Sequence, residues 1–377
     1  MHVPKVSPEC ALKFTKLGVS PLGCWPPSIN ATKKELIFRE IRWWISFLII
    51  LLFLFAEMYG ICKHYQDSMI VTQSICFCMG SSQIGIKMII IKSQSSRLQM
   101  VTIEMEDFIK KMNTFERTIL QRYVDKSAMF HLMMTFSYYT ICVAFIMGPI
   151  ILPRPFPTFA EYPFEVKSHP IYEIIYLHQA FVGIQAAVGV TIDCQVAFLL
   201  WFTGARFEML TIRLNNITNE RELRSCIKLH VYLLRYAENV VKSIRFIILT
   251  SIGVSSICIV FGGVEFLFAD SITLKLQFIS LIAGSIFELF LCCRPSDNLI
   301  EKSSAMGLAA YESNWINKSP KIKRNLYFLM QRSQKPMIIA IGGILPPFSL
   351  EYYLSVRYTT RITSNAECKV HSIKKFE

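Results

Sequence analysis

The sequence predicts an all-α, polytopic membrane protein with seven transmembrane helices and a cytoplasmic N-terminus. The chain has 377 residues and is 53% apolar, with a mean hydropathy of +0.39. A soluble chain would be nearer 45–50% apolar. The apolar residues gather in seven long runs, and a helical run of about 20 residues crosses the roughly 30 Å hydrocarbon core of a bilayer. The length suits one membrane domain without a second soluble domain.

The Lys and Arg residues between the apolar runs set the predicted orientation. Segments 1–42, 92–127, 206–245 and 294–335 hold seven, seven, eight and eight of them, whereas 62–68, 153–170 and 269–271 hold one, two and none. Cytoplasmic loops are enriched in these residues, so the N-terminus is predicted inside and the C-terminus outside. The net charge of +13 is then explained by basic loops that orient the helices and attract anionic lipid, rather than by nucleic-acid binding.

The chain divides into three predicted parts. Residues 1–42 are polar, basic and interrupted by prolines, which favours a cytoplasmic tail; 43–356 carry the seven helices and their cytoplasmic extensions; 357–377 form a polar C-terminal tail. The spans are predicted at 43–61, 69–91, 128–152, 171–207, 246–268, 272–293 and 336–356. The segment 92–127 is charged with a helical pattern, and 153–170 is a proline-rich, irregular outer loop that could cover a pocket.

Two predicted helices are longer than a bilayer requires. The apolar character of 171–207 continues for some 36 residues without proline, so this helix should project into the cytoplasm. The segment 223–244 is amphipathic and can run directly into the fifth span. Its predicted apolar face consists of Leu223, Ile227, Val231, Leu234, Ala237, Val241 and Ile244. Such extensions could pack into a cytoplasmic anchor bundle, or 223–244 could lie on the membrane surface.

The predicted seventh span has an unusual interior. Pro336 suits the first turn of a helix, where its missing N–H would be unpaired anyway. Gly342, Gly343, Pro346 and Pro347 would interrupt a soluble helix and survive in a membrane only where protein or water satisfies the freed carbonyls. This span is therefore interpreted either as facing a water-filled path or as a kinked packing helix.

No enzyme motif, phosphate-binding loop or cluster of metal ligands is present in the sequence, so we predict neither catalysis nor a cofactor or metal. Six ionisable residues in the predicted spans are singled out: Glu57, Lys87, Glu265, Lys275, Asp193 and Glu288. The first four lie near span ends, and Lys87 is interpreted as an anchor that reaches the inner surface. Asp193 and Glu288 lie deeper, with Arg206 and Arg294 as possible partners. A secondary transporter would use such residues, but no inverted repeat is apparent.

Three motifs near the C-terminus carry a family resemblance: Tyr311-Glu312-Ser313-Asn314-Trp315, Met330-Gln331-Arg332-Ser333-Gln334-Lys335-Pro336 and Phe348-Ser349-Leu350-Glu351. They resemble the C-terminal signature of the insect odorant receptor family. The positions that match it are Tyr311, Trp315, Arg332, Gln334, Lys335, Pro336, Ser349 and Leu350. A gustatory-type receptor of the same superfamily, or a G-protein-coupled receptor or secondary transporter if the topology were different, are the alternatives.

The resemblance implies a ligand-gated, non-selective cation channel subunit in the plasma membrane of sensory neuron dendrites. It also implies a small volatile organic ligand, a shared co-receptor subunit, a heterotetramer and a last helix that lines the pore. Candidate pore-lining residues are Gly342, Leu345, Pro346, Ser349 and Tyr353. An apolar cavity with a few polar groups is expected in the outer halves of the second, third, fourth and sixth spans. Its candidate lining residues are Phe77, Tyr138, Tyr139, Phe145, Met147, Tyr172, Tyr176, Phe181 and Gln277.

The resemblance is expected to end after Leu354. Family members continue with an apolar, aromatic stretch that supplies the narrow part of the pore, whereas residues 357–377 are polar and contain five Lys or Arg. The gate residues therefore cannot be assigned here. Either the tail is a wrong or alternative final exon that leaves the subunit non-conducting, or partner subunits and residues 342–353 line the pore.

Overall fold

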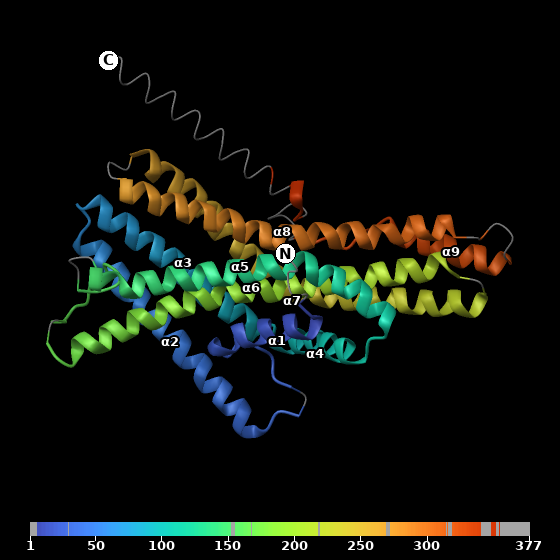
Figure 1. The fold of residues 1–377 in the computed structure, drawn as a ribbon, viewed down its shortest axis with the longest axis horizontal. Coiled ribbons are helices and arrows are strands. Elements are labelled where there is room, and N and C mark those ends of the chain that lie inside the picture. Colours follow the sequence, from blue (N-terminus) through green and yellow to red (C-terminus); the bar gives the residue numbers. More distant parts are fainter. Residues whose placement is uncertain are drawn as a thin grey trace, which may run out of the picture.

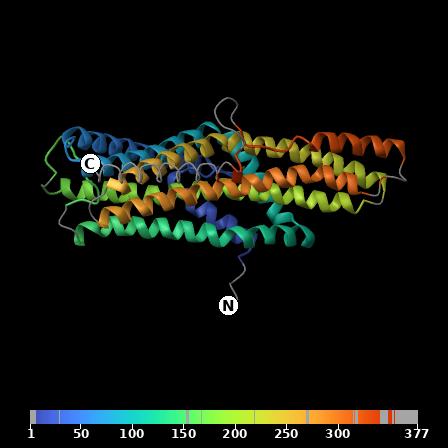
Figure 2. The same cartoon turned by 90° about the horizontal axis from the view of Figure 1, so that it is seen from above.

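The computed structural model is an elongated bundle of helices, which Figures 1 and 2 show from two sides. It describes residues 6–28, 30–151, 155–166, 168–217, 219–268, 272–313, 315, 319–340, 348–351 and 354. The turn between α2 and α3 and the segment 155–170 lie at one end of the bundle, which we call the loop end. The hairpin of α8 and α9 lies at the other end, which we call the α9 end (Figure 1).

The described residues contain the following helices, in chain order: α1 (Pro8–Val19), the short 3₁₀ helix η1 (Ser20–Leu22), α2 (Lys33–Lys63), α3 (Ser68–Ser93), α4 (Ser95–Lys111), α5 (Thr114–Ile151), α6 (Ile171–Asn215), α7 (Glu220–Phe268), α8 (Ile272–Glu312) and α9 (Pro320–Ser333). Six of them, α2, α3, α5, α6, α7 and α8, are long and apolar enough to cross a membrane. The predicted all-α class and the first six spans are therefore confirmed. Most of the seventh span, including 341–347, lies outside the described residues.

Helix α6 is the centre of the bundle. Its apolar window is 94% buried, against 22–44% for the other five membrane-length helices. It packs against α5, α7 and α8 as well as α1. Helix α6 has 45 residues and α7 has 49. At 1.5 Å per residue each is about 70 Å long, far more than a bilayer requires. The predicted extensions beyond the fourth and fifth spans are thus present.

The N-terminal segment is more ordered than a polar tail. Ser7 caps α1 by accepting a hydrogen bond from the Cys10 N–H, and Pro8 occupies the first helical position. This helix packs on α6, and the residues after it, Leu22 and Trp25, join the main apolar core. Helix α2 begins at Lys33 rather than near Trp43, because Thr32 and Glu35 form a capping box that starts the helix ten residues earlier. Its Lys33 end leans away from the bundle (Figure 1).

The amphipathic face predicted for 223–244 is partly wrong. Val231 is 45% exposed, and the buried positions run through Leu223, Cys226, His230, Leu233, Ala237, Val240 and Ile244. These positions are three or four residues apart and form one stripe of a helix. The prediction followed the aliphatic Ile227 and Val231 instead of the preceding Cys226 and His230, so its stripe is shifted by one residue at most positions from 227 to 241.

The predicted start of the seventh helix at Pro336 is also wrong. Residues 336–340 form no helix after the end of α9, and helix is described again only from Leu350. The Met337 N–H donates a hydrogen bond to Ser303 Oγ on α8 (2.9 Å), and the Phe348 N–H donates to the Ile339 carbonyl (2.9 Å). These bonds satisfy backbone groups that a helix would otherwise satisfy. Proline also disfavours helical geometry at the preceding residue, Lys335.

Candidate functional site

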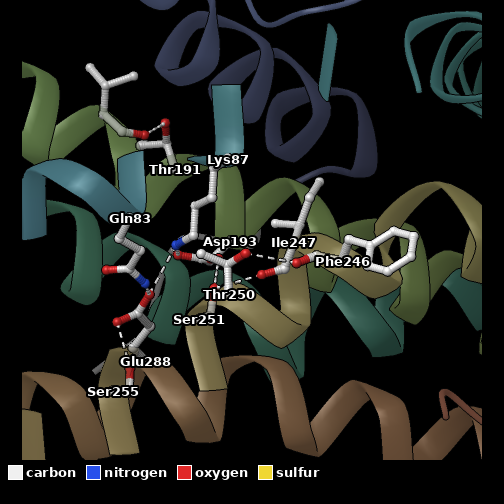
Figure 3. Close-up of polar contacts among 11 residues, drawn as sticks. Gln83, Lys87, Thr191, Asp193, Phe246, Ile247, Thr250, Ser251, Ser255 and Glu288 are labelled. Carbon is white, nitrogen blue, oxygen red and sulfur yellow. Dashed lines mark hydrogen bonds and ion pairs between the residues drawn. The ribbon is translucent and has the colours of Figure 1, made fainter. Parts of the chain in front are cut away.

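A buried charged cluster joins four of the membrane-length helices (Figure 3). The Lys87 Nζ of α3 lies 2.6 Å from Asp193 Oδ2 of α6 and 3.0 Å from Glu288 Oε1 of α8. Lys87 and Asp193 are 2% and 0% exposed, and Glu288 is also buried. One ammonium group therefore faces two carboxyl groups in the interior of the bundle. We call Gln83, Lys87, Asp193, Ser251, Ser255 and Glu288 the central cluster.

Neutral side chains complete the hydrogen bonding of the central cluster. The Ser251 hydroxyl donates to Asp193 Oδ1 (2.9 Å), and the Ser255 hydroxyl donates to Glu288 Oε2 (2.9 Å). The Gln83 amide donates to Glu288 Oε1 (2.6 Å). Every carboxyl oxygen of the cluster thus has a partner, which is the condition under which buried charge is tolerated.

The local sequence explains how the central cluster forms. Gln83 and Lys87 are four residues apart on α3, and Ser251 and Ser255 are four residues apart on α7. Residues at this spacing lie on the same face of a helix, so each pair points toward the same neighbours. The sequence therefore places two polar pairs opposite Asp193 of α6 and Glu288 of α8.

Three predictions about charged residues are corrected by this arrangement. Lys87 is an interior ion-pair partner, not an anchor at the membrane surface. The partner of Asp193 and Glu288 is Lys87 rather than Arg206 or Arg294. Arg206 instead pairs with Glu104 of α4 beside the rings of Phe108, Phe202, Tyr232 and Tyr236; Arg294 is exposed.

The structure brings some of the candidate ligand-binding residues together in the loop-end half. The rings of Phe77 (α3) and Phe145 (α5) meet edge to face, with centroids 5.4 Å apart. Tyr138 of α5 reaches α8, because its hydroxyl oxygen is 3.2 Å from where a Cβ of Gly284 would be. Gly284 is one turn before Glu288, so Tyr138 lies within electrostatic range of the central cluster.

The other candidates are more dispersed. Tyr172 and Tyr176 lie near each other on α6, and their hydroxyls donate to the carbonyls of Pro155 and Ile146. Gln277 accepts a hydrogen bond from Gln73 (3.1 Å) between α8 and α3. Tyr139 is half-buried against the main core. Met147 and Phe181 are 44% and 43% exposed, so they are poor candidates for an enclosed cavity.

The residues of the C-terminal motifs are only partly described. The Trp315 indole donates to the Tyr311 carbonyl (2.8 Å), and Arg332 donates to the Lys335 carbonyl (3.0 Å). Leu350 packs against the main core. Of the candidate pore-lining residues, Ser349 directly precedes the last described helical residues, whereas Gly342, Leu345, Pro346 and Tyr353 lie outside the described part of the chain.

A comparison with protein families decides the class of this helical bundle. A family model described as 7tm Odorant receptor matches residues 45–360. The chain belongs to the odorant receptor family. Membership confirms the resemblance in the C-terminal motifs and the prediction that the chain is a receptor rather than an enzyme. The match also extends beyond Leu354, where the resemblance was expected to end.

Similar proteins include other odorant receptors. Odorant receptor 67a of Drosophila melanogaster is 24% identical over 202 residues, which cover 50% of each chain. Odorant receptor Or2 of Anopheles gambiae is 23% identical over 274 residues, which cover 64% of this chain and 70% of the relative. The matched stretch thus spans only about half the length of some curated relatives.

The fold of this odorant receptor is similar to a solved one. The olfactory receptor OR5 of Machilis hrabei, solved in complex with eugenol, superposes with a TM-score of 0.78 at 16% identity. The superposition covers 95% of this chain and 97% of that receptor. At this identity the similarity establishes the shared fold. It shows that the helices described above, including the long extensions toward the α9 end, belong to an odorant receptor architecture.

Sequence reasoning missed Lys87 as a member of the candidate site. The signal was present in the composition of the spans, since Lys87 and the two deep acidic residues must find partners in an apolar bundle. The polar pairs Gln83–Lys87 and Ser251–Ser255 at four-residue spacing were the second signal. Assigning Lys87 to the membrane surface from its distance along the helix overlooked both.

Proposed function

We propose that this odorant receptor is a subunit of a ligand-gated, non-selective cation channel that detects a small volatile organic molecule. It would act with a shared co-receptor as a heterotetramer in the plasma membrane of sensory neuron dendrites, with its N-terminus in the cytoplasm. Family membership over residues 45–360 is the observation that carries the proposal. The similar fold of a receptor solved with eugenol supports a small organic ligand.

The geometry suggests how binding would favour an open state. A ligand can shift a conformational equilibrium only by binding one state more tightly than the other. Phe77, Phe145 and Tyr138 come from helices α3 and α5, and Tyr138 touches α8 at Gly284. The central cluster joins α3 and α8 directly to α6 and α7. A ligand against these aromatic rings would therefore act on helices whose relative positions the central cluster fixes.

Replacing Phe77 by alanine is expected to weaken the response to an activating odorant. A contact between the Phe77 ring and the odorant is taken to contribute as much as an edge-to-face aromatic pair, about 0.5–1.5 kcal/mol beyond its buried area. Its loss should raise the half-maximal odorant concentration roughly two- to tenfold. The measurement is a concentration series of odorant-evoked current in cells that express the receptor with its co-receptor. Phe181→Ala is the matched control, because Phe181 is 43% exposed. Equal shifts for the two variants would contradict the assignment of Phe77 to the ligand site.

The proposed orientation predicts where glycans can be attached. Asn30 and Asn216 begin sequons in segments assigned to the cytoplasm, so neither should carry sugar in insect cells. The variant Val166→Asn creates a new sequon with Ser168 in the segment at the loop end, and it should be glycosylated. Glycosidase treatment followed by gel electrophoresis detects glycosylation at the natural sequons and at the engineered one. A mass shift at Asn30, with none for Val166→Asn, would reverse the topology.

A further inference from the structure

A second acidic side chain is buried in the bundle, away from the central cluster. Glu57 lies near the loop end of α2, close to the end of the first predicted span, and is 0% exposed. Neither of its carboxyl oxygens has a hydrogen-bond partner of ordinary geometry among the described residues. The hydroxyl of Ser74 on α3 is also fully buried and likewise lacks a partner there. Two unsatisfied polar groups therefore occur together.

The surroundings of Glu57 combine polar and apolar groups. The hydroxyls of Ser74 and Thr158 are the hydrogen-bonding groups nearest to its carboxyl group, but neither reaches it with ordinary hydrogen-bond geometry. The Thr158 hydroxyl instead donates to Gln179 Oε1 (3.2 Å). Next to it, Phe53 and Ala56 of α2 form a small apolar cluster with Ala160 and Val182. Phe77 packs on this cluster and lies three residues after Ser74, which places both on one face of α3.

The neighbouring basic side chains, Lys63 and His64, already bind a different carboxylate. Lys63 Nζ and His64 Nε2 lie 3.1 Å from the two oxygens of Glu161, and the Glu161 N–H donates to the Ala56 carbonyl (3.2 Å). Burial alone would raise the pKa of Glu161, but the hydrogen bonds from His64 and Lys63 hold it below its ordinary value. Glu161 therefore remains a carboxylate that binds both side chains, and Glu57 receives neither.

An unpaired carboxylate in a buried position is costly, and a cation that pairs with it recovers much of the cost. A primary ammonium group has three N–H donors and no acceptor, as the ammonium group of lysine does. The acceptors available at this position are the two Glu57 oxygens and the Ser74 hydroxyl. The hydrocarbon part of a small amine would find apolar contacts directly beside them.

We propose that Glu57 and Ser74 form a subsite for the ammonium group of a small primary amine, whose hydrocarbon chain lies against Phe53, Ala56 and Phe77. The inference deepens the proposed function, because it names a chemical class of ligand for the loop-end half of the receptor. It also extends the ligand site from the aromatic pair of Phe77 and Phe145 to α2.

The test compares hexylamine with hexan-1-ol, which has the same chain and no charge at neutral pH. Purified full-length receptor in lipid nanodiscs is titrated with each compound, and the rise in thermal unfolding temperature gives an apparent affinity. The wild-type receptor should prefer the amine. Because hydrogen bonds to a charged group are the stronger class, Glu57→Gln should reduce the ratio of amine to alcohol affinity by roughly tenfold or more.

Two further variants make the result decisive. Glu161→Gln makes the same chemical change at the same end of the molecule and should keep the amine preference. Ser74→Ala should reduce the preference several-fold, and it serves as the test if Glu57→Gln does not fold. No preference in the wild type, or a preference that survives in a folded Glu57→Gln or in Ser74→Ala, would overturn the subsite.

Currents recorded with the co-receptor separate this inference from the proposed function. Amine binding that depends on Glu57, without current from any ligand, would support the subsite and overturn the channel assignment. Alcohol-evoked current together with an amine response that Glu57→Gln leaves unchanged would support the channel and overturn the subsite.

Discussion

Replacing Lys87 by methionine is expected to destabilise the folded receptor by about 3–5 kcal/mol, the usual cost of removing one partner from a buried ion pair. The substitution keeps a long side chain but leaves Asp193 and Glu288 without their cation. In a bilayer these carboxyl groups have no water to replace it. Thermal unfolding of the detergent-purified receptor, followed by size-exclusion chromatography, measures the loss.

Two variants identify the cause of that loss. Lys92→Met removes a lysine whose side chain is 35% exposed and pairs with Glu40, and such surface pairs contribute only about 0–1 kcal/mol. The triple variant Lys87→Met/Asp193→Asn/Glu288→Gln removes all three charges and should recover a substantial part of the lost stability. A single Lys87→Met variant as stable as Lys92→Met would show that the central cluster does not hold the four helices together.

Replacing Phe202 by alanine is expected to cost about 3–5 kcal/mol, the range for truncating a fully buried aromatic side chain. Phe202 of α6 is 0% exposed. Its ring meets Phe108 of α4 and Tyr236 of α7 edge to face, with centroids 5.4 and 6.0 Å away. It therefore joins three helices where α6 continues beyond the central cluster. The measurement is the same thermal unfolding series.

Phe136→Ala is the matched control for Phe202→Ala. Phe136 of α5 is 71% exposed, which suits a side chain that faces lipid. Its truncation leaves no cavity between helices, so the unfolding temperature should change little. A comparable loss of stability in both variants would mean that α5 does not present this face to lipid.

Hydrophobic patterning was enough to predict the helices but not which way their side chains point. Met147 and Phe181 were expected in a cavity, but the structure leaves them 44% and 43% exposed. Lipid and a protein interior are both apolar, so an apolar residue in a span does not reveal its side of the helix. The face of 223–244 was misjudged for a related reason, because Cys226 and His230 are buried in place of residues that look more hydrophobic.

Polar residues carried information that hydropathy did not use. The Ser7-Pro8-Glu9 start of α1 and the capping box of Thr32 and Glu35 were readable as helix N-termini. Both were overlooked because the segment was judged by its charge. The non-helical course of 336–340 could not have been predicted in the same way. It depends on Ser303 of α8, more than thirty residues earlier in the chain, which accepts the Met337 N–H.

Whole-cell current during an odorant panel tests the proposed channel function most directly. The receptor is expressed alone and with the co-receptor, and surface expression is checked in each case. Odorant-evoked cation current only when both subunits are present is the predicted result. A variant whose residues after Leu354 are replaced by an apolar terminus tests whether the polar tail prevents conduction. No current from either version, despite surface expression with the co-receptor, would contradict the assignment of this chain as a channel subunit.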